Sequence, residues 1–121
     1  MEELVSLRPF VPALDFGLSK RFYQMLGFEL TTGDQQTAIL KLGGFSFILQ
    51  DFYVKEFADN YMIQLLVRDA DTWWRRINGP KLTEEFAVKA PTPPVMQRWG
   101  MKVGFLFDPS GVLWHVAEVP F

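Results

Sequence analysis

FVPALDFGLSKRFYQMLGF, at positions 10–28, is the stretch that decides the fold, because a second stretch of the chain repeats its pattern. The related segment is LLVRDADTWWRRINGP at positions 65–80. A shift from position 15 to position 69 places Asp15 on Asp69, and the same shift places Arg21 on Arg75. An internal repeat of this kind indicates a duplicated structural unit, and paired units commonly leave a ligand-binding cleft between them.

A second pair of segments closes the two repeats. The first repeat ends with KLGGFSFILQD at positions 41–51, and the second ends with DPSGVLWHVAE at positions 108–118. The shift from position 44 to position 111 places Gly44 on Gly111 and Phe47 on Trp114. We therefore expect one domain at 1–121, with module 1 at about 1–52, a linker at about 53–60 and module 2 at about 61–121.

Composition excludes several classes of protein. The chain has 121 residues, a net charge of −2, 49% hydrophobic residues and no cysteine. The absence of cysteine excludes a disulfide scaffold and thiolate metal ligands. An acidic balance without clustered Lys and Arg argues against a nucleic-acid partner. No apolar run is long enough for a membrane span and no signal peptide is recognisable, so we expect no membrane partner and a cytoplasmic location.

Local signals predict a β-α-β-β-β order in each module. Asp15 is placed to cap a helix over 16–26, and Asp69 or Asp71 to cap one that ends at Asn78-Gly79-Pro80. Alternating apolar residues and turn signals predict the strands. In module 1 these are 7–13, 28–31, 37–42 and 45–51, and in module 2 they are 61–68, 81–88, 101–107 and 112–119, with a stiff proline-rich loop at 89–98.

Two of these motifs resemble those of a known superfamily. The string SKRFYQMLGF at 19–28 and the turn Asp108-Pro109-Ser110-Gly111 before VLWH resemble the glyoxalase/bleomycin-resistance/dioxygenase (vicinal oxygen chelate) superfamily. The resemblance covers essentially the whole chain. It implies an α+β fold in which two βαβββ modules form a cupped eight-stranded mixed sheet, commonly as a homodimer whose two chains complete the cleft.

The resemblance also implies where a divalent metal would bind, on strands that face the cleft. Counted from the motifs, the four ligand positions of this chain are Arg8, Ile48, Met62 and His115. A catalytic divalent metal needs imidazole, carboxylate or thiolate donors, typically three or more from the protein. One histidine with an arginine and two apolar residues does not supply them. We therefore expect no metal and no other cofactor.

The predicted cleft then offers ligand contacts in place of metal ligands. Arg98 and Trp99 lie at the end of the proline-rich loop, where they can cover the cleft. Strand alternation puts Phe45, Phe47 and Trp114 on the opposite face, in the core. The predicted ligand-binding residues are Arg8, Ile48, Gln50, Met62, Gln64, Arg98, Trp99 and His115.

Two functions remain open from the sequence. The first is a binding protein that sequesters a small organic molecule in a metal-free cleft, as the bleomycin-resistance-like members do with an antibiotic. The alternative is an enzyme, either a glyoxalase-like lyase or isomerase or a dioxygenase, with His115 as the candidate catalytic residue. A third possibility is a degenerate member that acts only as a dimeric interaction domain. The expected partners are a small organic molecule and a second copy of the chain.

Overall fold

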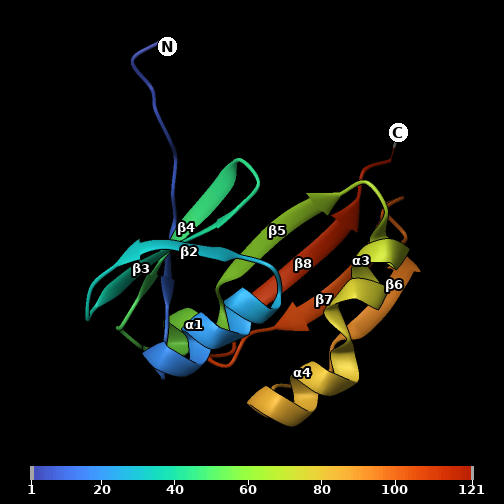
Figure 1. Cartoon of the computed structure of the whole chain (residues 1–121). Coiled ribbons are helices and arrows are strands. Elements are labelled where there is room, and N and C mark those ends of the chain that lie inside the picture. The colour runs from blue at the N-terminus through green and yellow to red at the C-terminus, as the bar shows by residue number, and fades with distance from the viewer. Residues whose placement is uncertain (1, 121) are drawn as a thin grey trace.

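The computed structural model describes residues 2–120 and has the predicted α+β architecture of two similar modules (Figure 1). The first module contains β1 (Phe10–Pro12), α1 (Phe16–Met25), β2 (Glu29–Gly33), β3 (Thr37–Leu42) and β4 (Phe45–Gln50). A short helix, α2 (Lys55–Asp59), follows in the linker, where the sequence reasoning expected none. The second module contains β5 (Met62–Val67), α3 (Ala70–Ile77), α4 (Gly79–Phe86), β6 (Thr92–Met96), β7 (Lys102–Phe107) and β8 (Leu113–Glu118).

The eight strands of the described region form two four-stranded sheets, one in each module. The strand orders are β1-β4-β3-β2 and β5-β8-β7-β6, so the two sheets have the same topology. In both, the first strand pairs in parallel with the last, and the remaining neighbours are antiparallel. The duplicated architecture and the α+β fold class are therefore confirmed, with the strands divided between two mixed sheets.

Both predicted helix starts are confirmed by their caps. The Asp15 carboxylate accepts a hydrogen bond from the Leu18 amide at 3.1 Å, and the Asp69 carboxylate accepts one from the Thr72 amide at 3.0 Å. Each satisfies an amide of the first turn that has no partner within its helix. No helix among residues 2–120 is long and apolar enough to cross a membrane.

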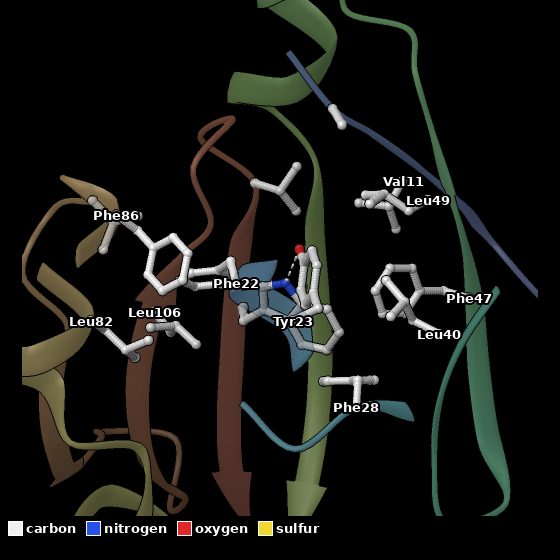
Figure 2. Close-up of a cluster of buried hydrophobic side chains, with 14 of the residues drawn as sticks. Val11, Phe22, Tyr23, Phe28, Leu40, Phe47, Leu49, Leu82, Phe86 and Leu106 are labelled. Carbon is white, nitrogen blue, oxygen red and sulfur yellow. Dashed lines mark hydrogen bonds between the residues drawn. The ribbon is translucent and has the colours of Figure 1, made fainter. Parts of the chain in front are cut away.

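One hydrophobic core joins the two modules. Tyr23 of α1 is fully buried, and its ring lies 4.9 Å from the ring of Phe47 on β4 and 5.7 Å from that of Trp114 on β8. Figure 2 shows Tyr23 at the centre of this cluster, with Phe47 and Leu40 on one side. The helix of the first module therefore fills the space between the inner faces of both sheets.

A buried chain of hydrogen bonds fixes this arrangement. The indole nitrogen of Trp114 donates to the Tyr23 hydroxyl at 2.9 Å, and that hydroxyl donates to the carboxylate of Asp108 at 2.6 Å. The second oxygen of Asp108 accepts the amides of Ser110 and Val112 at 2.8 and 2.9 Å. The two sequence motifs, FY-x-x-LGF and D-P-S-G, are thus in direct contact across the core.

The segment predicted as a strand at 81–88 is helical, and that prediction was wrong. Asn78 caps the new helix, because its side-chain oxygen accepts the Lys81 amide at 3.4 Å. Leu82 and Phe86 are four residues apart, and both are buried against the core. This spacing is the helical signal that the sequence reasoning missed. The Phe86 ring packs edge-on against Phe22 at 5.4 Å, so α4 closes one side of α1.

The proline-rich segment expected to be a loop at 89–98 contains the strand β6. Two adjacent prolines, Pro93 and Pro94, are tolerated there because β6 is the outermost strand of its sheet and its register shifts between Thr92 and Val95. Gly104 on β7 lies opposite, where an added Cβ would approach the Thr92 carbonyl oxygen to 3.1 Å.

Removing the Tyr23 hydroxyl tests the buried hydrogen-bond chain. Tyr23→Phe leaves Oδ2 of Asp108 without its hydroxyl donor and the Trp114 indole without its acceptor, so we expect a loss of about 2 to 3 kcal/mol in the free energy of unfolding. Tyr53→Phe is the matched control, because Tyr53 lies outside this chain and is only partly buried. Urea unfolding of both variants measures the difference, and equal losses would contradict the assigned role.

The loss should also depend on pH. Burial raises the pKa of Asp108, and the Tyr23 hydroxyl opposes that rise by donating to the carboxylate. Removing the hydroxyl raises this pKa further. A carboxyl group whose pKa is raised in the folded state stabilises that state when the pH is below the pKa of the unfolded chain. This stabilisation is lost as the pH rises through the pKa of the folded state. The deficit of Tyr23→Phe should therefore be largest at neutral pH and shrink as the pH falls towards the ordinary value of 3.8.

Candidate functional site

Each sheet has one face in the core and one face turned away from it. Phe47 and Trp114 point into the core, and their neighbours Ile48 and His115 therefore point outward, because successive side chains of a strand alternate. The sequence analysis assigned Ile48 and His115 to this outer side. Phe45 was expected in the core and is not buried there. It is two residues before Phe47 and on the same face of the strand, but it lies at the strand end and is 77% exposed.

An aromatic cluster lies on the outer face of the second sheet. The ring of Trp99 lies parallel to that of His115, with centroids 6.4 Å apart and an angle of 22° between the planes. Phe105 on β7 is the register partner of His115 and contacts it edge-on at 5.4 Å. Gln64 on β5 is its register partner on the other side, with Nε2 lying 3.4 Å from Nδ1 of the imidazole. We call Gln64, Trp99, Phe105 and His115 the aromatic cluster.

The cluster can hold a planar ligand by stacking and by directional hydrogen bonds. Trp99 is 56% exposed, so its ring presents an apolar surface to solvent. The Gln64 amide contacts Nδ1 of the imidazole, so Nε2 is the ring nitrogen that remains for a hydrogen bond with a ligand. A stacking surface beside a few placed polar groups is the usual composition of a small-molecule site.

The remaining predicted residues of the second module lie around this cluster. Met62 is two residues before Gln64 on β5, so it shares the outer face, and it is 60% exposed. Arg98 precedes Trp99 in the turn between β6 and β7 and is exposed. The structure therefore places Met62, Gln64 and His115 on one face of the second sheet, with Trp99 stacked on His115 and Arg98 in the adjoining turn.

The three predicted residues of the first module lie on a different surface. Ile48 and Gln50 belong to the outer face of the first sheet, and Arg8 precedes β1 in an exposed segment. Among residues 2–120, no hydrogen bond, ion pair or ring contact joins these three residues to the aromatic cluster. A single chain thus does not bring the eight predicted residues together in one site.

The donor set at His115 does not fit a divalent metal. The imidazole has an amide, an indole and a phenyl group as neighbours, and these provide no carboxylate or second imidazole. No group of three or more His, Asp or Glu side chains that could hold a metal ion occurs in the described part of the chain. The metal chemistry that the fold implies in other proteins therefore has no matching ligands at these positions.

The sequence analysis missed Phe105 as a site residue. Phe105 alternates with the buried Leu106 on β7, so the strand pattern placed it on the outer face. The missing information was the register between β7 and β8, which pairs Phe105 with His115. That pairing joins positions in two strands and is not encoded in the spacing of either strand alone.

Comparison with solved structures places this fold among known binding proteins and enzymes. The bleomycin-binding protein of Streptomyces verticillus, complexed with copper(II)-bleomycin, superposes with a TM-score of 0.80 at 22% identity, over 98% of this chain and 99% of that one. The bleomycin resistance determinant encoded on transposon Tn5 superposes with a TM-score of 0.77 at 21% identity, over 98% of this chain and 100% of that one. A lactoylglutathione lyase from Agrobacterium tumefaciens superposes with a TM-score of 0.68 at 16% identity, over 98% of this chain and 96% of that one.

These neighbours confirm the fold that the two motifs predicted. The chain has the fold of bleomycin-resistance and glyoxalase-type proteins. Neither a protein-family model nor a curated protein sequence matches it. Because the neighbours include both binding proteins and a lyase, the fold by itself does not assign the function.

Substitutions at two adjacent positions of β8 test the assignment of the two faces. Trp114→Ala removes a buried ring and should lower the free energy of unfolding by about 3 to 5 kcal/mol. His115→Ala removes a partly exposed ring and should cost less than about 1 kcal/mol. Thermal or urea unfolding measures both. A larger loss for His115→Ala than for Trp114→Ala would reverse the assignment of faces.

Proposed function

We propose that the protein binds a small organic molecule without a metal ion, on the aromatic cluster of the second sheet. The observation that carries the proposal is the exposed Trp99 ring, parallel to His115 and backed by Phe105. Exposing the apolar face of an indole to water costs free energy, and this cost is recovered when a planar group covers the ring. The structural neighbours that bind bleomycin support a role in sequestration.

We further propose that a second copy of the chain supplies the facing wall, so that the protein is a homodimer with a cleft shared between chains. The outermost strands β1 and β5 each have a single paired neighbour among the described residues. The segment before β1 projects away from the two sheets (Figure 1), and it carries the apolar residues Leu4, Val5 and Leu7. Val5 and Leu7 are 97% and 95% exposed, which favours packing against another surface.

In this dimer, the outer face of one chain's first sheet lies opposite the aromatic cluster of its partner. Arg8, Ile48 and Gln50 then contribute to the same cleft as His115, although they are separated from it within one chain. Arg8 would bring a guanidinium group to an otherwise neutral cluster, which suits a ligand with a carboxylate or another acceptor group. The eight residues predicted from the sequence are thereby united in one site.

Titration with bleomycin, both metal-free and as the copper complex, tests the binding function. Calorimetry should detect binding to the unaltered protein, and Trp99→Ala should weaken it about fivefold, which corresponds to the loss of one stacking contact of about 1 kcal/mol. Phe52→Ala is the control, since Phe52 is also an exposed aromatic residue and lies outside the cluster. If both variants bind equally well, the aromatic cluster is not the site.

The second candidate function is an enzyme that uses His115, and it is favoured by the contact between His115 and Gln64. An amide that orients an imidazole is the kind of partner that a general acid or base uses. His115→Ala separates the two functions. An enzyme would lose turnover of its substrate while keeping much of its affinity, whereas a binding protein would only lose affinity.

Sedimentation at several protein concentrations tests the dimer. We expect a monomer–dimer equilibrium, and Val5→Asp together with Leu7→Asp should shift it towards the monomer by at least about tenfold in dissociation constant, because charge replaces apolar contact area. Leu14→Asp is the control, since Leu14 is also an exposed leucine and lies outside the projecting segment. A monomer at every concentration would remove the proposed facing wall.

A further inference from the structure

A groove separate from the aromatic cluster lies between the two modules of a single chain. Its cavity has a volume of about 480 Å³, within the range of small-molecule sites. One side is the end of the β3–β4 hairpin, with Leu42 and Phe45, and the other is α3, with Trp73 and Arg76. In Figure 1 this hairpin and α3 lie on opposite sides of β5, which contributes Leu65. His115 and Trp99 are not among its lining residues.

The internal repeat explains why this space is open. The shift that places Asp15 on Asp69 also places Phe22 on Arg76 and Tyr23 on Ile77. In α1, the two aromatic residues are fully buried and fill the gap between the sheets. In α3, the equivalent of Phe22 is an exposed arginine, and burying a guanidinium without a partner is costly. The second helix therefore leaves unfilled the kind of gap that the first helix closes.

The lining of the groove is amphipathic. Its floor is apolar, formed by Phe28, Leu106 and Trp114, and Phe45 at its rim is largely exposed. A second cavity with a volume of about 360 Å³ shares Phe28, Phe45 and Trp114 with the groove and extends along β5 towards Pro9. Gln64 of the aromatic cluster also lines this second cavity. An elongated apolar body therefore has room along the strand.

The lining of the groove carries an excess of positive charge. Arg68 and Arg76 both line it, together with a single carboxylate, that of Asp69. The Asp69 carboxylate accepts the Thr72 amide at the start of α3, and its pKa is lowered chiefly by this hydrogen bond. Neither arginine has an ion-pair partner or a hydrogen-bonded side-chain partner among residues 2–120. Two guanidinium groups beside an apolar channel match a carboxylate attached to an apolar body.

We propose that this groove binds an amphiphilic monocarboxylate, with the carboxylate at Arg76 and Arg68 and the apolar body along β5 towards Phe45. The site is complete in one chain, whereas the proposed cleft needs two, and the two sites meet at Gln64. Charge complementarity decides the class of ligand: an uncharged amphiphile would gain only the apolar contacts, and a cationic one would be repelled by the two arginines.

Decanoate is the probe, compared with 1-decanol and decyltrimethylammonium, which have the same apolar chain and a neutral or cationic head. Titrations of the full chain should give the tightest binding for decanoate. Nuclear magnetic resonance should show the largest shifts at the Trp73 indole and the amides of Gly43 and Gly44, next to the hairpin end. Equal affinity for 1-decanol, or shifts centred on Trp99 and His115, would overturn the proposal.

Two pairs of variants locate the head and the body of the ligand. Arg76→Gln should weaken decanoate binding about tenfold through loss of a charge-assisted contact. Arg75→Gln should leave it unchanged, because Arg75 is the adjacent arginine, donates to the Thr72 hydroxyl and does not line the groove. The two variants have the same net charge, so equal effects would show long-range attraction only and overturn the site.

For the apolar body, Phe45→Ser should weaken binding, whereas Leu14→Ser should not. Both residues are largely exposed, so both variants should fold, which circular dichroism verifies. If Phe45→Ser instead dissociates a dimer, and the unaltered protein does not bind decanoate, the groove is a contact between copies of the chain and the proposal fails.

Discussion

The structure depends on the buried hydrogen bonds that join Trp114, Tyr23 and Asp108. A carboxylate in an apolar core is costly to desolvate, and this cost is offset only when both of its oxygens are hydrogen-bonded. Asp108 meets this condition with one hydroxyl from the first module and two amides of its own turn. A packing of α1 that moved Tyr23 away would leave Oδ2 of Asp108 without its hydroxyl donor. The interaction therefore selects one arrangement of the two modules, and it turns Trp114 inward and His115 outward.

The parts of the fold that the sequence predicted are those with local signals. The caps Asp15 and Asp69 and the turn glycine Gly111 each act within a few residues, and the structure has them as expected. The sequence also contained both halves of the buried contact, but Tyr23 and Asp108 are 85 positions apart and no local pattern pairs them. The helix α4 was misread because its signal, the spacing of Leu82 and Phe86, competed with a strand interpretation. The candidate site followed the same rule: strand alternation indicated the outward face of His115, but only the register revealed Phe105.

Duplication followed by divergence accounts for the difference between the two faces of the molecule. The two sheets retain the same strand order, since each must pair its first strand with its last. Their helices have diverged: α1 buries Phe22 and Tyr23, whereas α3 has Arg76 and Ile77 at the equivalent positions and is followed by α4. Helix α1 therefore fills the space between the sheets, whereas α3 borders an open groove lined by arginines and by apolar side chains of both modules.

The two proposed sites differ in how they depend on assembly. The groove takes all its lining from one chain, so its affinity should not vary with protein concentration. The aromatic cluster has one wall within the chain, and a ligand held between two chains must favour their association by the same free energy with which association favours the ligand. Ligand binding at His115 and dimer formation are thus linked by thermodynamics, whereas the groove needs no second chain to form and meets the aromatic cluster only at Gln64. A chain of this size can in this way carry one site that senses assembly and one that does not.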